Sequence, residues 1–192
     1  MTVIVLATHN AHKVGELRRI LGDGLGPHEL VAFDGPEPVE DGATFAENAL
    51  IKARAAHAHT GLPAIADDSG IAVAALGGAP GIHSARYAGS RDDGDNLRLL
   101  LANLDGVADR TAAFVCAAAY AGPDGEHVVT AEWPGEVLAG PVGAHGFGYD
   151  PVFRPAGETR SAAELSPEEK DATSHRARAF GALLPELRRR LG

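Results

Sequence analysis

The chain has 192 residues, with 17 lysines and arginines against 26 aspartates and glutamates, and a formal net charge of −9 at pH 7. This length favours a single domain over residues 1–192, or one domain with two lobes, that folds without disulfides or metals. The acidic balance argues against a general nucleic-acid binder, which usually carries a basic face, but it allows a small anionic ligand held by a local cluster.

Cysteine content and hydropathy limit the cellular setting. Cys116 is the single cysteine, so no intrachain disulfide forms, and its apolar neighbours predict a small buried side chain rather than a nucleophile. Residues 2–7 are too short for a signal sequence and lack a basic flank, and no apolar run reaches the roughly 18 residues of a membrane span. We therefore expect a protein of the reducing cytoplasm without membrane contact.

Apolar periodicity and turn residues predict alternating strands and helices. In chain order these are a strand over 2–7, a helix over 11–21, a strand over 29–33, a helix from Thr44 to about Thr60 and a short strand over 64–66. They continue with a helix over about 93–104, strands over 111–121 and 126–133 that form a hairpin, a short helix from Ser166 and a terminal helix over 175–191.

Several helix ends carry recognisable signals. Asn10 is a natural N-cap for the first helix. Thr44 and Glu47 have the spacing of a capping box, so Glu47 is assigned a structural role rather than a catalytic one. Gly61 then ends the helix. The run 188–190 of three arginines is expected to be a solvated helix end.

Lysine is rare in this chain. Only Lys13, Lys52 and Lys170 occur, against fourteen arginines, and each lies in a polar segment. A lysine ammonium is a compact charge on a flexible stem that suits phosphate, whereas arginine presents a rigid planar fork. We interpret these lysines as candidate phosphate or nucleotide ligands; the alternative is three ordinary surface positions.

A polar turn, Thr8-His9-Asn10-Ala11-His12-Lys13, joins the first predicted strand to the first helix. Free backbone N–H groups at such a helix N-terminus favour an anion. Lys13 in the first turn opposes the helix dipole, which is reasonable if a phosphate lies between them. The alternative is a tolerated surface lysine.

Carboxylates gather in two segments. Asp67-Asp68-Ser69-Gly70 follows the strand over 64–66 and precedes apolar residues 71–73, so we predict a turn inside the fold. Adjacent carboxylates there require a nearby cation or polar network, which favours a metal or catalytic role over a solvated turn. Glu40 lies in the proline-bearing loop 36–42.

Glycines surround two aromatic residues in the segment 143–153. Such a sequence forms little regular structure and lets a ligand approach the backbone closely. Phe147 or Tyr149 is positioned to stack on a base, and a structured turn with packed aromatics is the equal alternative. Trp133, in contrast, is expected in the core.

These groups together suit one anionic substrate. Lys13 and Lys52 would neutralise phosphates, while Glu40 and Asp68 with the substrate phosphates would hold Mg²⁺. The set predicts hydrolysis of a nucleoside polyphosphate, in which a carboxylate orients or deprotonates the attacking water.

At this point a resemblance is visible. The chain resembles the inosine triphosphate pyrophosphatase family nearly end to end. The matching motifs are Val5-Leu6-Ala7-Thr8-His9-Asn10-Ala11-His12-Lys13, Gly42-Ala43-Thr44-Phe45-Ala46-Glu47-Asn48-Ala49 through Lys52-Ala53, Pro63-Ala64-Ile65-Ala66-Asp67-Asp68-Ser69-Gly70, Leu76-Gly77-Gly78-Ala79-Pro80-Gly81, Ser84-Ala85-Arg86-Tyr87, Gly146-Phe147-Gly148-Tyr149-Asp150-Pro151 and Ser174-His175-Arg176.

The resemblance implies an elongated two-lobed α/β fold with a mixed sheet, an active-site cleft between the lobes, and a homodimer. It implies Mg²⁺-dependent cleavage of ITP, dITP or XTP to the monophosphate and pyrophosphate. Catalysis would fall to Asp68 and Lys52, with Glu40 and Asp68 on the metal. The implied substrate contacts are Thr8, His9, Asn10, Ala11, His12, Lys13, Ser69, Arg86, Phe147, Gly148, Tyr149, Asp150, Lys170, His175 and Arg176.

His175 and Arg176 suggest how the base would be selected. As donors they would pair with the 6-keto oxygen of hypoxanthine or xanthine, where adenine presents an amino donor. We therefore expect Arg176→Ala to erode ITP-over-ATP discrimination more than stability. Two positions depart from the family pattern: His9 stands where many relatives have glycine, and His83 where an aromatic is common.

Two rival functions remain. One is a pyrophosphatase for modified pyrimidine or methylated nucleotides, which a substrate panel scored by pyrophosphate release would separate. The other is a non-catalytic purine-nucleotide sensor, which would bind ITP without hydrolysing it.

Overall fold

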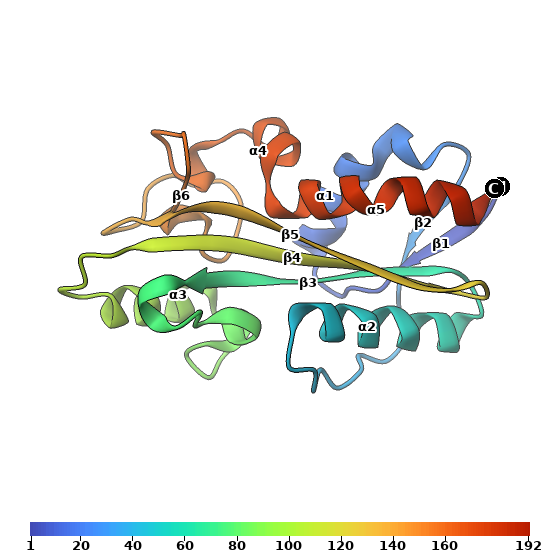
Figure 1. Cartoon of the computed structure of the whole chain (residues 1–192), viewed down its shortest axis with the longest axis horizontal. Helices are drawn as coiled ribbons and strands as arrows, with labels where there is room; N and C mark the ends of the chain where they lie inside the picture. The colour runs from blue at the N-terminus through green and yellow to red at the C-terminus, as the bar shows by residue number, and fades with distance from the viewer. The chain divides into compact units, whose positions relative to one another are not determined.

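Helices and strands alternate along this mixed α/β protein, and the computed structural model describes all residues 1–192. The strands are β1 Val3–Leu6, β2 Glu29–Ala32, β3 Ala64–Val73, β4 Thr111–Gly122, β5 Gly125–Val137 and β6 Phe153–Pro155, and the helices are α1 Ala11–Leu21, α2 Phe45–Thr60, α3 Asp93–Asn103, α4 Pro167–Thr173 and α5 His175–Leu191. The predicted α/β fold with a mixed sheet is confirmed: the sheet order is β2-β1-β3-β4-β5-β6 (Figure 1).

The chain divides into two compact units, each built from separated segments. Unit 1 comprises Met1–Asp68, Cys116–Ala131 and Arg176–Gly192, and unit 2 comprises Ser69–Val115 and Glu132–His175. Strands β3, β4 and β5 contribute residues to both units. No helix of the protein combines the length and apolar character that crossing a membrane requires.

Unit 1 is built on strand β1, whose side chains alternate between two faces. It pairs in parallel with β2 and β3, and both of its faces are buried, as is usual for parallel strands covered by helices. Ile4 and Leu6 join a core cluster with α1 and α5, whereas Val5 and Ala7 join a second cluster with α2. Figure 1 shows α1 and α5 on one side of these strands and α2 on the other.

Unit 2 has its own core. Leu100 and Leu104 at the end of α3 pack with Phe114, Trp133 and Phe153 from the strands. Trp133 is 3% exposed, which confirms its predicted place in the core.

The predicted turn at 67–70 is wrong, because β3 runs through these residues without interruption. The polar sequence is compatible with a buried strand because both carboxylates have partners, described below. Gly70 allows a close approach in unit 2: a Cβ atom at this position would lie 2.3 Å from Oγ of Ser84. That hydroxyl in turn accepts a hydrogen bond from the amide of Ile71 at 2.9 Å.

Helix boundaries agree closely with the sequence signals. The Asn10 side chain caps α1, and Gly61 ends α2 in the left-handed conformation. The Thr44 hydroxyl accepts from the amide of Glu47, but the Glu47 carboxylate accepts from Ala43 rather than Thr44. The reciprocal half of the predicted capping box is therefore shifted by one residue.

The arginine run at the end of α5 is less free than predicted. Nε of Arg188 donates to the carbonyl of Gly24 at 2.9 Å. Arg190 pairs with Asp124 at 3.0 Å and lies over the ring of Tyr120. These contacts attach the C-terminal helix to the η1 turn (Gly22–Leu25) and to the β4–β5 hairpin.

Candidate functional site

Four buried or half-buried charges in unit 1 connect α1, β3 and α5. Nζ of Lys13 is 3.0 Å from Oδ2 of Asp67, and Nη2 of Arg176 is 3.2 Å from the same oxygen. Arg176 also pairs with the carboxylate of Glu16. Two cations and two carboxylates thus compensate one another in a region with little solvent, where an unpaired charge would be costly.

The electrostatic consequence is clearest at Asp67, which is 1% exposed. Burial raises its pKa, but the charges of Lys13, Arg176 and Lys52 together hold that pKa well below its usual range. Asp67 therefore remains an ionised counterion. Its role differs from that of its neighbour, a distinction that the sequence left open.

Asp68 and Lys52 form the second ion pair. Nζ of Lys52, on α2, lies 2.8 Å from Oδ1 of Asp68 on β3 and 3.2 Å from Oε2 of Glu40. Burial lowers the pKa of Lys52, yet the charges of Asp68, Asp67 and Glu40 outweigh it, so the pKa is raised. One ammonium thus bridges the two carboxylates that the sequence assigned to a metal.

At Asp68, in contrast, the effect of burial on the pKa outweighs the effect of the neighbouring charges. Burial raises the pKa of its carboxyl group, although the ammonium of Lys52 opposes that change. Its second oxygen, Oδ2, is buried without a hydrogen-bond partner. A carboxylate with a raised pKa and an uncommitted oxygen is suited to accept a proton or to bind a cation.

The phosphate turn, defined as residues 8–13, lies at the N-terminus of α1. The side chain of Asn10 accepts from the amides of His12 and Lys13 at 2.9 and 3.3 Å, and the amide of Asn10 donates to the hydroxyl of Thr8. His9, Asn10, Ala11 and His12 are exposed. The turn is therefore preformed and accessible, as an anion site at a helix N-terminus requires.

Unit 2 holds a second buried pair. Nζ of Lys170 lies 2.6 Å from Oδ2 of Asp150 and 5.1 Å from the centre of the Phe147 ring. The same carboxylate oxygen accepts from the amide of Phe147 at 2.9 Å, and the amide of Gly148 donates to Asp93. The glycine-aromatic loop is therefore held in one conformation, with Phe147 half-buried.

Two further predicted residues of unit 2 are buried. The hydroxyl of Tyr149 donates to the carbonyl of Ser84 at 2.8 Å, so this ring is packed. The imidazole of His175 stacks on Phe114, with ring centres 4.7 Å apart and an angle of 11° between planes. Ser69 is half-buried and Arg86 is exposed.

The predicted site residues thus fall into two groups. Unit 1 holds the phosphate turn, Glu40, Lys52, Asp68 and Arg176. Unit 2 holds Ser69, Arg86, Phe147, Gly148, Tyr149, Asp150, Lys170 and His175. The guanidinium of Arg176 engages Asp67 and Glu16, contacts that the sequence did not predict. Glu16 was missed by sequence reasoning; the available signal was a carboxylate beside Leu17 on the apolar face of the first helix.

No three His, Cys, Asp or Glu side chains are grouped so as to hold a metal ion by themselves. Two carboxylates with an uncommitted buried oxygen do fit a cation such as Mg²⁺, which proteins usually hold with one or two carboxylates, substrate phosphates and several waters. The donor set therefore fits a metal that arrives with a phosphate ligand.

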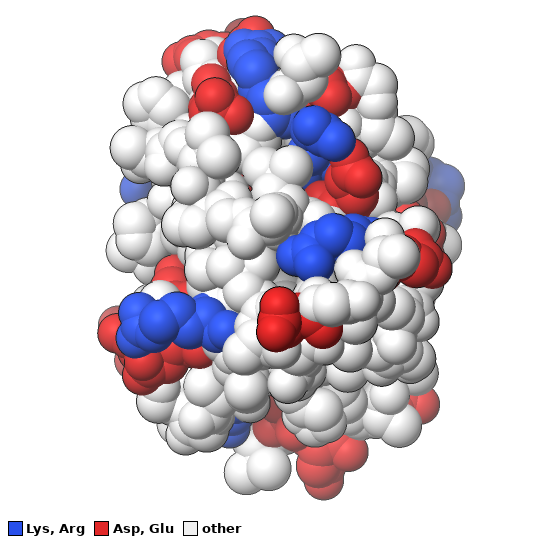
Figure 2. Space-filling model, turned by 90° about the vertical axis from the view of Figure 1, so that its left-hand side faces the viewer, with Lys and Arg blue, Asp and Glu red and all other residues white.

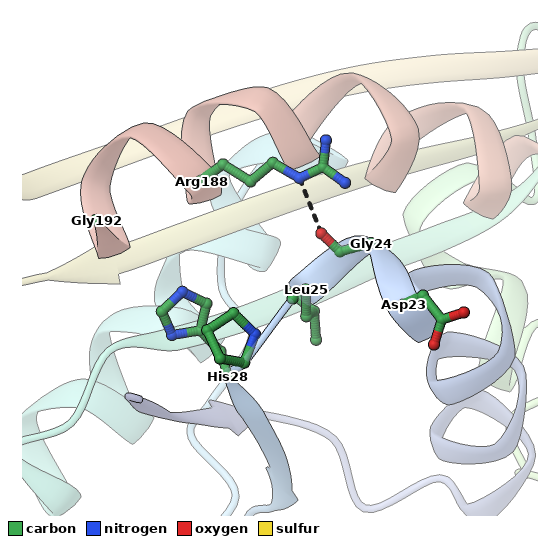
Figure 3. A pocket seen from close by; sticks show the side chains of 8 residues that line it. Asp23, Gly24, Leu25, His28, Arg188 and Gly192 are labelled. Carbon is green, nitrogen blue, oxygen red and sulfur yellow. Dashed lines mark hydrogen bonds between the residues drawn. The ribbon is translucent and has the colours of Figure 1, made fainter.

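Two further surface features, a pocket and the charge distribution on one face, do not point to a different site. A pocket of about 340 Å³ in unit 1 is lined by Asp23, Gly24, Leu25, Gly26, Pro27, His28, Arg188 and Gly192 (Figure 3), and it includes none of the predicted site residues. On the face drawn in Figure 2, lysines and arginines lie among aspartates and glutamates without forming a continuous basic patch.

The fold and these side chains define an α/β protein with paired lysines and carboxylates suited to a phosphate-bearing ligand. The model of the Ham1 family matches residues 4–186, and the chain belongs to that family.

Individual relatives agree with this membership. The chain is 55% identical to the dITP/XTP pyrophosphatase of Leifsonia xyli subsp. xyli, over 98% of this chain and 96% of the relative. The structure of a HAM1 protein from Coxiella burnetii is 41% identical, with a TM-score of 0.88 over 98% of this chain and all of the other. The dITP/XTP pyrophosphatase structure from Mycobacterium abscessus is 50% identical, with a TM-score of 0.76 over 95% and 99% of the two chains.

Proposed function

We propose that this chain is a nucleoside-triphosphate pyrophosphatase that hydrolyses the non-canonical purine nucleotides ITP, dITP and XTP. The products are the nucleoside monophosphate and pyrophosphate. The observation that carries the proposal is the arrangement of Asp68, Lys52 and Glu40, in which one ammonium lies 2.8 Å from the first carboxylate and 3.2 Å from the second. The names of relatives about 55% identical over the full chain support the same substrate class.

The phosphate turn and two lysines would bind the triphosphate. The amides of Asn10, His12 and Lys13 already donate to side chains of the turn, so the positive end of the helix dipole would be what attracts the phosphate. Lys13 is already compensated by Asp67, which stays paired with Arg176 when Lys13 turns toward a phosphate. Lys52 would neutralise charge beside the carboxylates, which lowers the energy of the transition state as negative charge redistributes.

Asp68 would act on the attacking water. Its carboxylate removes a proton as the water oxygen forms a new bond to phosphorus. The bond between the α-phosphoryl group and the bridging oxygen then breaks, and its electron pair leaves with pyrophosphate. In the protein without metal, burial raises the pKa of Asp68, which favours acceptance of a proton by this carboxylate.

Mg²⁺ is the cofactor we propose, with Glu40 and Asp68 as its protein ligands. When bound, it would supply Lewis-acid stabilisation of phosphate charge. One observation supports such a site: Oδ2 of Asp68 is buried without a hydrogen-bond partner. Ser69 and Arg86 are proposed as further substrate contacts.

The nucleoside would be bound by residues of unit 2. Phe147, fixed beside Lys170, offers a ring for stacking, and His175 offers an imidazole donor toward a 6-keto oxygen. Gly148, Tyr149 and Asp150 would shape the loop around the base. Such a donor would be left unpaired by adenine, which carries an amino group at that position.

³¹P NMR of the products from ITP and Mg²⁺ tests the proposal. Inosine monophosphate and pyrophosphate in equal amounts are expected. Inosine diphosphate with phosphate would show cleavage of the other bond and refute the assignment. Binding of ITP without turnover would favour a nucleotide sensor. Faster turnover of modified pyrimidine or methylated nucleotides would favour the rival pyrophosphatase for those substrates. A homodimer is also proposed, and sedimentation equilibrium would test it.

A further inference from the structure

His9 joins the phosphate turn to the acidic loop, defined as residues 34–41. Its Nε2 atom lies 2.9 Å from the carbonyl oxygen of Gly35. A backbone carbonyl can only accept a hydrogen bond, so Nε2 must carry the proton and donate it. This contact links two segments that are 26 residues apart in the chain.

Aromatic packing holds the two partners in place. The imidazole of His9 lies against Phe33, with ring centres 5.8 Å apart, and Phe33 meets His59 of α2 edge-on at 5.6 Å. Gly35 folds over the same ring: a Cβ atom there would lie 2.3 Å from Phe33. Glycine at this position therefore lets the backbone come close enough to present its carbonyl to His9.

The acidic loop carries Glu40, whose carboxylate lies 3.2 Å from the ammonium of Lys52. The loop has neither helix nor strand, and Val39 beside Glu40 is 80% exposed. His9 attaches the loop near its start, at Gly35. After its end, the amide of Gly42 donates to the side chain of Asn48 at 2.9 Å. Glu40 thus lies on a short segment fixed at both sides.

We propose that His9 is a positioning residue, whose hydrogen bond to Gly35 holds the acidic loop so that the Glu40 carboxylate stays beside Lys52. This hydrogen bond restrains the acidic loop in the protein without metal or substrate. Its consequence for metal binding rests on the proposed function, because Glu40 is there a ligand of Mg²⁺. A carboxylate already in place loses less conformational freedom when a cation binds.

NMR of the protein without metal or substrate tests the restraint itself. A long-range ¹H–¹⁵N spectrum should show the proton of His9 on Nε2. Backbone order parameters of Val39 and Glu40 should fall in His9→Ala. They should recover in His9→Gln, whose side-chain amide places an N–H donor close to the position of Nε2.

His57→Ala is the matched control. His57 also contacts a backbone carbonyl, with Nδ1 2.6 Å from the oxygen of Leu62, but it lies at the end of α2 outside the acidic loop. This substitution removes the same kind of contact and should leave the order parameters of residues 39 and 40 unchanged.

Activation by Mg²⁺ tests the consequence. The Mg²⁺ concentration for half-maximal ITP hydrolysis should rise about two- to tenfold in His9→Ala, the effect expected from one lost hydrogen bond. Turnover at saturating Mg²⁺ should change less. His9→Gln should restore the wild-type concentration, and His57→Ala should match it.

The two tests fail separately. Unchanged order parameters in His9→Ala, or a fall that His57→Ala reproduces, would overturn the positioning role whatever the activity. Lower order parameters with an unchanged Mg²⁺ requirement would overturn the link to metal binding. Absence of any pyrophosphatase activity in the wild-type chain would refute the proposed function and leave the NMR result intact.

Discussion

The ammonium of Lys13 lies 3.0 Å from Oδ2 of Asp67, a carboxylate whose side chain is fully buried. A lysine at a helix N-terminus is unfavourable for the helix dipole, so this ion pair explains how the position is tolerated without a ligand. Arg176 contacts the same oxygen at 3.2 Å. The carboxylate of Asp67 therefore keeps Arg176 as a partner when Lys13 moves, and substrate binding need not leave a buried charge unpaired.

Asp67→Asn should destabilise the protein strongly, because it leaves Lys13 and Arg176 close together without their shared anion. Breaking a buried pair from one side costs about 3–5 kcal/mol. Chemical denaturation gives the free energy of unfolding. Arg54→Ala is the control: it removes an exposed pair with Glu126, and a change within about 1 kcal/mol is expected. Equal losses would contradict the buried network.

The effect of Asp67→Asn should depend on pH. Folding lowers the pKa of Asp67, so its contribution to stability is present above the unfolded value near about 4 and is lost as pH falls below it. The difference in unfolding free energy between wild type and variant should be largest near neutral pH and should shrink toward pH ~2. A difference that grew on acidification would have the wrong sign.

Arg176→Ala should lower stability, which reverses the expectation from the sequence. The guanidinium is 1% exposed and pairs with Asp67 and Glu16. Its removal leaves two buried carboxylates, at a cost of several kcal/mol. Denaturation and the ITP/ATP ratio of kcat/KM should be measured on the same preparation. Normal stability with lost discrimination would restore the base-recognition role.

Asp68→Asn should abolish most turnover while retaining the fold. An amide cannot take the proton of the attacking water, and a loss of about 10²–10⁴-fold in kcat is expected. Lys52 keeps Glu40 as a partner, so the far-UV circular dichroism and melting temperature should stay close to wild type. Activity near the wild-type level would reject Asp68 as the base.

Cys116 should be unreactive in the native protein. The thiol is fully buried, and burial together with the negative charge of Asp67 raises its pKa. A thiol-specific disulfide reagent should therefore modify one cysteine per chain in concentrated guanidinium chloride and essentially none under native conditions. Rapid native labelling would show that this strand opens readily.

Local sequence signals predicted the helices well, because these signals depend on neighbours in the chain, but they did not predict strand β6 or the full length of β3. Asn10 and Gly61 mark the ends of α1 and α2 through hydrogen bonds within a few residues. The segment 67–70 was mistaken for a turn because its polar residues are typical of turns. Its strand conformation depends on Lys13 and Arg176, which are distant in sequence, and no local pattern reports them.

In the candidate site too, local patterns predict which residues take part but not the contacts between residues distant in sequence. The sequence groups Lys52, Asp68 and Glu40 in one site but assigns the lysine to phosphates and the carboxylates to a metal, so their direct ion pairs are a structural finding. The ion pair between Arg176 and Glu16 could not be predicted, because a sequence motif identifies a residue but not the side chain that it contacts. His9 was noted as a departure from the family pattern, but its contact with Gly35 depends on how two loops meet.

The position of α5 in the first core cluster has a consequence for biosynthesis. Phe180, Leu183 and Leu187 pack there with Ile4 and Leu6 of β1. Strand β1 is synthesised long before α5, so its apolar face lacks these packing partners until residues 175–191 have been translated. We expect the nascent chain to expose this apolar surface during that interval, when ribosome-associated chaperones can bind it.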